Sequence, residues 1–257
     1  MDNVIKVLYV TQEICPYLPE SEIADICRKL PQAIQENGKE IRTFMPKFGC
    51  INERRNQLHE VIRLSGMNLI IDDTDHQLII KVASIQAARM QVYFIDNDDY
   101  FNRKSTTQDE NGEDFDDNED RAIFFARGVI ETIKKLNWVP DIIHFNGWMA
   151  SFIPIYLKNY YKTDSYFNDT KLVLSVYNEK DLSLGDNITE KLKFDNIENL
   201  KALEEPTIQS FVIESMNLVD TIVKGDEFLE EKLDKAFEES KTPKNEYVDG
   251  GSISEIY

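Results

Sequence analysis

Short apolar runs rich in β-branched residues alternate along the chain with segments in which apolar residues recur at helical spacing. Such runs occur at Val4–Val10, Glu40–Pro46 and Asp141–Asn146. Buried parallel strands are near-continuous apolar runs, and helices that cover a sheet carry one apolar face. The pattern therefore predicts an α/β fold, a Rossmann-like, doubly wound and mainly parallel sheet with helices on both faces.

Helical spacing marks three segments of the first 161 residues. The first helix begins near Ser21, and Glu36-Asn37-Gly38 is a typical helix C-terminus. The second is expected over Glu119–Trp138 and the third over Gly147–Tyr161, where Pro154 should bend it. These helices alternate with predicted strands, as the units of a parallel sheet require.

A β-rich insertion interrupts this alternation. Strand-like runs at Gly66–Asp73, His76–Ile85 and Met90–Asn97 have brief polar connections, which predicts an antiparallel meander. The following segment, residues 104–120, contains eight acidic residues within Asp109–Asp120 and has no apolar periodicity. We expect it to form a mobile acidic loop.

The C-terminal part continues the α/β pattern. A buried strand is predicted at Lys171–Asn178, a short strand at Asp220–Lys224 and a charged helix at Gly225–Ser240. The sequence has no internal repeat and no convincing interdomain linker. We therefore expect one domain over residues 1–240 and a flexible tail over residues 241–257.

The charge balance excludes several functions. Lys and Arg number 29 against 47 Asp and Glu, a formal net charge of −18, so nucleic acid and anionic membranes are not expected partners. The start of the sequence has no signal-peptide pattern, and no apolar run is long enough for a membrane span. Cys15, Cys27 and Cys50 form no CxxC pair and no zinc pattern with the histidines. We expect a cytoplasmic protein without disulfides, metal or cofactor.

The turn after the first strand lies where an α/β protein commonly binds a phosphate on free backbone N–H groups. Such turns favour glycine and lysine, whereas this one contains Pro19, Glu20, Ser21 and Glu22. Carboxylates repel a phosphate, and Pro19 has no N–H to offer it. Ser21 and Glu22 instead suit a helix N-terminus. We expect this turn to begin a helix without binding phosphate.

Three longer motifs resemble one family. They are "VLYVTQEICPY" with Glu13 and Pro16, "VYFIDNDDYFNR", and "DNEDRAIFFARGVIETIKKLNWVPDIIHFNGWMASFIPIYLKNYY" with its Asn-x-x-Arg-x-x-Phe-Phe and His-x-x-x-Trp patterns. Over roughly residues 4–225 the chain resembles the N-terminal half of bacterial glycogen and starch synthases, retaining glycosyltransferases of the two-domain GT-B type. The resemblance implies one half of a GT-B fold and ADP-glucose-dependent synthesis of α-1,4-glucan.

The sequence departs from this family at its donor site. The family's Lys-Thr-Gly-Gly-Leu is replaced by the degenerate donor loop Pro19-Glu20-Ser21-Glu22-Ile23, although Asp25 in the following helix is retained. The family's His-Asn, whose histidine contacts the reacting sugar, is Tyr177-Asn178, and its Asp-Trp-His is Gly147-Trp148-Met149. The second domain of the family has no counterpart in the sequence. ADP-glucose is therefore a doubtful ligand, and we assign no catalytic residue.

The remaining cleft candidates combine position and resemblance. His144 ends a predicted strand, where α/β sheets bind ligands, but a single histidine is also commonly structural. Trp148 suits stacking on a sugar ring and equally a position in the core. Glu13 is better placed for polar ligand atoms than for packing. The full set of cleft candidates is Glu13, Asp25, His144, Trp148, Tyr177 and Asn178.

We therefore predict a glycogen or starch synthase family protein that is impaired or inactive as an isolated chain. Two alternatives stay open, a non-catalytic glucan-binding or regulatory subunit and a half-enzyme that needs a separate second domain. The candidate partners are an α-glucan or malto-oligosaccharide and a second protein chain. An apolar face near the C-terminus would favour the second chain. Phe211–Val223 is the candidate for it, and the same segment could instead be core.

Overall fold

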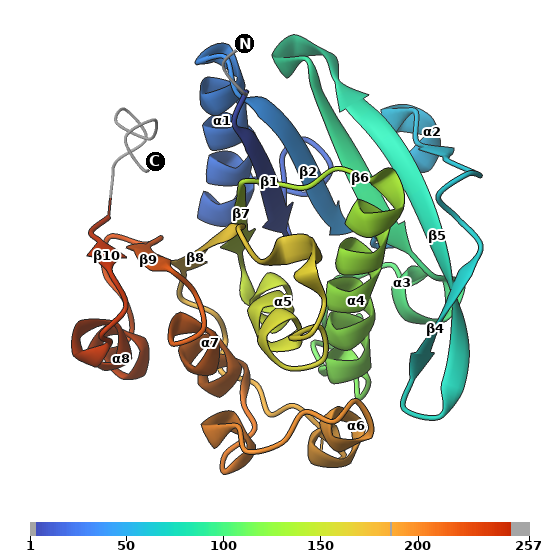
Figure 1. Ribbon diagram of the computed structural model, residues 1–257. Coiled ribbons are helices and arrows are strands. Elements are labelled where there is room, and N and C mark those ends of the chain that lie inside the picture. The colour runs from blue at the N-terminus through green and yellow to red at the C-terminus, as the bar shows by residue number, and fades with distance from the viewer. Residues whose placement is uncertain (1–3, 186, 248–257) are drawn as a thin grey trace.

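A twisted central sheet organises the protein in the computed structural model, which describes residues 4–185 and 187–247 (Figure 1). Its strand order is β10-β9-β8-β7-β1-β2-β6-β5-β3, and β4 pairs with β5. The strands are β1 Lys6–Thr11, β2 Glu40–Pro46, β3 His59–Glu60, β4 Met67–Ile71, β5 Thr74–Ile85, β6 Met90–Asp96, β7 Ile142–Asn146, β8 Lys171–Val176, β9 Thr221–Lys224 and β10 Lys244–Asn245. The α-helices are α1 Glu22–Glu36, α2 Glu53–Asn56, α3 Asp98–Phe101, α4 Asn118–Leu136, α5 Trp148–Lys158, α6 Ile188–Phe194, α7 Ile208–Met216 and α8 Glu231–Glu239.

The predicted fold class is confirmed. Adjacent strands pair in parallel along the order β10-β9-β8-β7-β1-β2-β6. The β-rich insertion is antiparallel, with β5 pairing to β4, β6 and β3. Because β6 also pairs with β2, the insertion extends the main sheet and does not form a separate unit.

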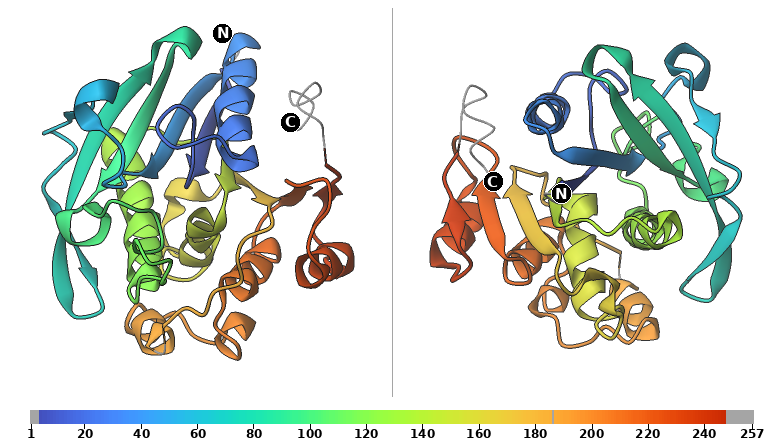
Figure 2. Two further views of the ribbon diagram at one scale, coloured as in Figure 1. Left: turned by 180° about the vertical axis from the view of Figure 1, so that it is seen from behind. Right: turned by 45° about the horizontal axis from the view of Figure 1, so that its top comes forward.

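Helices cover both faces of this sheet. Val7 and Tyr9 of β1 pack against Leu30 and Ile34 of α1, whereas Leu8 and Val10 face the larger core that includes α4 and α5. Figure 2 shows α1 on one side of the sheet and α4 and α5 on the other. The alternation along β1 follows from the period of two in a strand, so a run that is apolar throughout is buried on both faces.

Two expectations about mobile segments differ from the structure. The acidic segment ends at Asp117, since Asn118, Glu119 and Asp120 form the first turn of α4. The first part of the predicted tail contains a strand, because Lys244–Asn245 form β10 and pair with β9. Residues 248–257 of that tail lie outside the described residues.

The apolar face expected at Phe211–Val223 is part of the interior. Phe211 and Ile222 are fully buried, and Phe211 stacks on Phe152 of α5 with ring centroids 4.9 Å apart. This segment is therefore core and does not present a docking face.

Candidate functional site

The direction of chain progression reverses between β1 and β7, the topological switch point at which α/β sheets bind ligands. From β1 the chain moves to β2 on one side, and β7 lies on the other side. At the carboxyl ends of these two strands Thr11 is the register partner of Asn146, and the Gln12 N–H donates to the Asn146 carbonyl at 3.3 Å. Three cavities surround this point, and Glu13 lines all three.

The first cavity, called here the aromatic cavity, has a volume of about 190 Å³. Its walls combine flat apolar side chains with amide, hydroxyl and carboxyl groups, a composition suited to a polar ring with apolar faces. The lining residues are Gln12, Glu13, Phe48, Thr106, Thr107, Gln108, Trp148, Met149, Glu179, Lys180, Leu182 and Ile208.

Glu179, which follows β8, hydrogen-bonds in this cavity to residues that follow β1 and β7. Its Oε1 accepts hydrogen bonds from Gln12 Nε2 at 3.1 Å and from the Trp148 backbone N–H at 3.2 Å. Burial, and after it the nearby Glu13 carboxylate, raise the pKa of Glu179 to about 8, against the opposing effect of the two N–H donors. Glu179 therefore carries a proton at neutral pH, which a carboxyl group in water does not.

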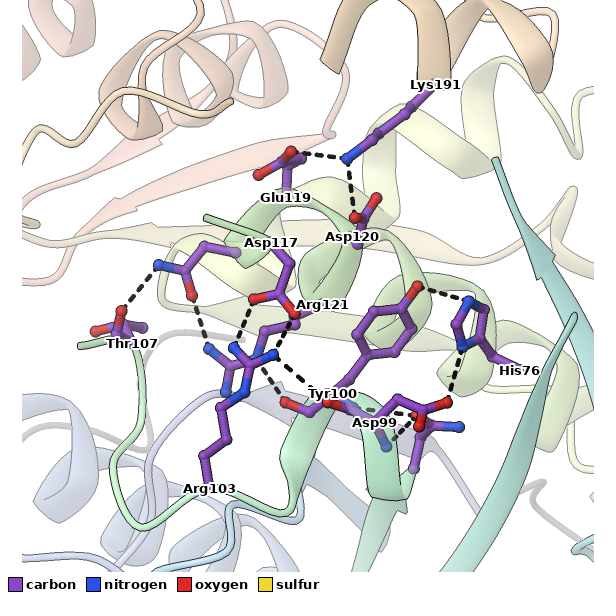
Figure 3. Close-up of polar contacts among 12 residues, drawn as sticks. His76, Asp99, Tyr100, Arg103, Thr107, Asp117, Glu119, Asp120, Arg121 and Lys191 are labelled. Carbon is purple, nitrogen blue, oxygen red and sulfur yellow. Dashed lines mark hydrogen bonds and ion pairs between the residues drawn. The ribbon is translucent and has the colours of Figure 1, made fainter. Parts of the chain in front are cut away.

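Thr106, Thr107 and Gln108 of the acidic segment line the aromatic cavity, and hydrogen bonds connect Thr107 to α4 (Figure 3). Asn118 Nδ2 donates to the Thr107 carbonyl at 2.9 Å, and Arg121 Nη1 donates to Asn118 Oδ1 at 2.7 Å. Arg121 Nε also donates to the Tyr100 carbonyl at 2.8 Å. The fully buried guanidinium thus connects α3, α4 and the cavity wall.

Three ion pairs also fix this region. Arg103 pairs with Asp117 at 2.5 Å, and Lys191 of α6 pairs with both Glu119 and Asp120 at 2.8 Å (Figure 3). These contacts use residues of the two motifs that resemble the family at 92–103 and 117–161. The acidic residues of this segment therefore serve partly as internal anchors.

A second cavity, called here the acidic cavity, has a volume of about 550 Å³ and lies between the start of α1 and the ends of β8 and β9. Burial, together with the neighbouring Glu22 carboxyl, raises the pKa of Asp226 to about 6. None of the residues that line it within the described ranges is Lys or Arg. They are Glu13, Ser21, Glu22, Ile23, Tyr177, Asn178, Glu179, Asp226, Glu227 and Phe228.

The predicted donor loop lies between the acidic cavity and a third cavity of about 510 Å³ that includes Pro19, Glu20 and Ser21. Ser21 is the N-cap of α1, where its Oγ accepts from the Ala24 N–H at 3.0 Å and donates to Glu13 Oε2 at 2.5 Å. The protein's own hydroxyl and carboxylate thus occupy the position next to the helix N-terminus.

The structure brings four of the six cleft candidates to these cavities. Trp148 lines the aromatic cavity, Tyr177 and Asn178 line the acidic cavity, and Glu13 lines both. Asn178 bonds to the chain after β9, accepting from the Glu230 N–H at 2.7 Å and donating to the Phe228 carbonyl at 2.7 Å.

His144 and Asp25 lie elsewhere. His144 is fully buried within the sheet, where Nε2 lies 2.7 Å from Ser175 Oγ, and burial lowers its pKa to about 3. Asp25 is exposed on α1 and pairs with Lys29 at 2.5 Å. Neither residue lines the three cavities around Glu13.

Sequence reasoning missed Gln12, Glu179 and Asp226. Gln12 directly follows β1, Glu179 lies three residues after β8, and Asp226 lies two residues after β9. The rule that ligands bind beyond the carboxyl ends of such strands could have found them.

Among the described residues, no group of three or more His, Cys, Asp and Glu side chains is arranged to hold a metal ion. No helix in the described ranges has both the length and the apolar character to cross a membrane.

Comparisons with known proteins agree with the motifs. The family model for the starch synthase catalytic domain matches residues 6–224. The chain is 42% identical over 174 residues to the glycogen synthase of Chlorobium limicola and 41% identical to that of Pelodictyon phaeoclathratiforme, in each case over 67% of this chain and 36% of the relative. The match thus spans about a third of the length of these curated relatives.

A solved structure supports the fold. The catalytic domain of starch synthase IV from Arabidopsis thaliana, bound to ADP and acarbose, superposes with a TM-score of 0.67. The superposition covers 86% of this chain and 45% of that chain at 16% sequence identity, so the likeness concerns the α/β fold alone.

Proposed function

Because the chain belongs to the starch synthase catalytic domain family, we propose that it binds an α-glucan or malto-oligosaccharide at the switch point without itself holding a nucleotide-sugar diphosphate. In this proposal the 257-residue chain is impaired or inactive as a glycogen synthase on its own. The proposal includes a cytoplasmic location, which the three free cysteines support.

The single observation that carries the proposal is that acidic side chains surround the capped N-terminus of α1. Its cap hydroxyl is bonded to the Glu13 carboxylate, and Glu22 follows in the first turn. A diphosphate bound here would meet at least two carboxylates a few ångströms away, each costing on the order of 1 kcal/mol in a screened environment. Oxyanion binding at a helix N-terminus requires the opposite charge pattern.

The aromatic cavity supports glucan binding. Gln12, Gln108 and Glu179 offer hydrogen-bonding groups, and the rings of Trp148 and Phe48, which are 3% and 1% exposed, form part of its apolar wall. An uncharged sugar has the matching combination of apolar ring faces and hydroxyl groups. The Arabidopsis structure with a similar fold contains acarbose, which is consistent with an oligosaccharide ligand.

A transfer assay tests this function. Purified chain is incubated with ADP-glucose labelled in the glucose and with maltohexaose, and incorporation into the oligosaccharide is measured. We expect no incorporation above a blank without protein, together with saturable maltohexaose binding by calorimetry. Incorporation above the blank would contradict the proposed loss of donor binding, and absence of maltohexaose binding would contradict the glucan assignment.

The half-enzyme alternative, in which a second chain completes the site, is favoured by one observation. Phe228 is 77% exposed although it lines the acidic cavity. An apolar ring at the rim of a polar cleft is a typical anchor for a partner. The test is co-purification from the source cells of the unaltered chain and of Phe228→Ser, because this alternative requires a partner that the variant loses.

A further inference from the structure

Resting on the proposed glucan-binding function, we propose that Glu179 determines specificity in the aromatic cavity, where its carboxyl group hydrogen-bonds to a hydroxyl of an uncharged sugar through Oε2. No motif assigned this residue, and it lies immediately after Asn178 at the end of β8. The proposal names both the ligand class, an uncharged polyol, and the group that recognises it.

The hydrogen bonds of Glu179 favour a donor role for Oε2. Oε1 accepts from Gln12 Nε2 at 3.1 Å and from the Trp148 N–H at 3.2 Å, while Oε2 has only a longer contact of 3.4 Å to the same Gln12 nitrogen. A protonated carboxyl group has one O–H donor in addition to its acceptor capacity. With Oε1 occupied as an acceptor, Oε2 is the oxygen left to carry the O–H, and Glu179 is one of the residues that line the cavity.

No cation neutralises this carboxyl group in the described part of the chain. Lys180, the adjacent cationic residue, pairs with Asp114 of the acidic segment at 3.5 Å. The charged groups that face Glu179 from neighbouring elements are Glu13 after β1 and Asp226 after β9, and both carboxylates raise its pKa. Burial is the largest cause of the raised pKa, and the N–H groups of Trp148 and Gln12 oppose it. The phenol of Tyr177, on the same strand end, stays neutral because burial raises its pKa.

A departure from the family motif creates this arrangement. Gly147 stands where the resembling family has aspartate, and it has φ +83° and ψ 162°. A Cβ at this position would lie 2.5 Å from Gln12 Cδ and 2.7 Å from Gln12 Oε1. Glycine therefore leaves the space that the Gln12 side chain fills, and Gln12 in turn holds Glu179.

The protonation of Glu179 determines which hydrogen bonds it can make to a sugar. A neutral acid beside the Glu13 carboxylate can bond to a hydroxyl oxygen, whereas an ionised Glu179 would offer acceptors only. Binding of an uncharged oligosaccharide should therefore weaken as Glu179 loses its proton above neutral pH. An anionic sugar would be repelled by the carboxylates that line the two adjoining cavities.

The test is calorimetric titration of the full chain with maltohexaose at pH 6.5 and pH 9.5. We expect the affinity of the unaltered chain to fall several-fold between these pH values. Glu179→Gln, which keeps one acceptor and one donor, should retain the affinity at pH 6.5 and lose the pH dependence. Glu179→Ala should bind about tenfold more weakly at pH 6.5, the effect of one hydrogen bond. Glu190→Gln, on the exposed side of α6, is the matched control and should behave like the unaltered chain.

A second measurement does not depend on the ligand. Infrared difference spectra between the unaltered chain and Glu179→Gln at pH 7 should contain the C=O band of one protonated carboxyl group. Glucan binding that is unchanged in Glu179→Ala, or absence of that band, would overturn this inference and leave the proposed function standing. Absence of maltohexaose binding by the unaltered chain at either pH would overturn both.

Discussion

The hydroxyl of Ser21 and the carboxylate of Glu13 form a hydrogen bond of 2.5 Å across the turn that follows β1. The same hydroxyl caps α1 by accepting from the Ala24 N–H. This pair fills the position at which a phosphate would approach the helix, and it does so with negative charge. The start of α1 is therefore capped by a contact within the chain.

Ser21→Ala should destabilise the protein. It removes the α1 cap and leaves the Ala24 N–H without its side-chain acceptor, so the free energy of unfolding should fall by about 1 kcal/mol. Urea unfolding followed by circular dichroism measures this change. Ser84→Ala, at an exposed position of β5, is the control and should change the value by less than about 0.5 kcal/mol. Equal effects of the two substitutions would contradict the capping role.

Gly147→Ala should be more damaging than Gly38→Ala. Both glycines have positive φ, +83° and +82°, but a Cβ at Gly38 meets nothing within 4 Å, whereas one at Gly147 meets Gln12. We expect a loss of roughly 1 kcal/mol at Gly38 and roughly 2–4 kcal/mol at Gly147. Thermal and urea unfolding of both variants provide the comparison. A similar loss for both would mean that the Gln12 contact has no energetic importance.

Arg121→Met should weaken the attachment of the acidic segment. The substitution leaves Asn118 Oδ1 and the Tyr100 carbonyl without their buried donor, which costs roughly 2 kcal/mol of unfolding free energy. Hydrogen exchange should also become faster in residues 104–117. The control is Arg103→Met, which breaks the partly exposed pair with Asp117 and should cost less than about 1 kcal/mol. Unchanged exchange in the Arg121 variant would argue against its role in holding the cavity wall.

The raised pKa of Glu179 predicts a pH-dependent difference in stability. Its folded pKa of about 8 lies above the unfolded value of about 4.3, so the folded state binds the proton more tightly. The resulting stabilisation is complete below the unfolded pKa and is lost as the pH rises toward 8. Relative to the unaltered chain, Glu179→Gln should therefore gain unfolding free energy steadily from pH 5 to pH 8. For Asp226→Asn the corresponding window should end near pH 6, because burial and Glu22 raise the pKa of Asp226 only to about 6. Differences that do not vary with pH would refute both assignments.

Trp148→Phe should reduce oligosaccharide affinity roughly three- to tenfold, because a smaller ring provides less stacking area. Trp138→Phe is the matched control. Trp138 is also nearly buried, but it bonds to Glu40 and does not line the aromatic cavity. Maltohexaose titration of the two variants distinguishes a ligand-contacting tryptophan from a core tryptophan, and equal affinities would place Trp148 in the core alone.

Much of the fold could be predicted because its elements depend on local patterns. The strand at Glu40–Pro46 has the predicted bounds, and α1 ends at Glu36 before Asn37 and Gly38, as its C-terminal signal indicates. Strand β10 was not predicted, since two residues carry no periodicity and their pairing with β9 depends on the tertiary fold.

The candidate site was predictable only in part. Glu13, Trp148 and Asn178 could be found from strand ends and motifs. The position of Glu179 after β8 was open to the same reasoning. Its raised pKa was not, because that follows from burial and from Glu13, which is more than 160 residues away in sequence. For His144 the position at a strand end was predicted correctly, but the side chain is fully buried within the sheet and lines none of the three cavities.

The measurement that tests the central claim most directly is calorimetric titration of the unaltered chain with ADP and, separately, with maltohexaose at pH 6.5. The account predicts saturable binding of maltohexaose and no saturable binding of ADP in the millimolar range, because carboxylates surround the α1 N-terminus. Saturable ADP binding that tightens in Glu22→Gln would place the diphosphate at that turn and contradict the account.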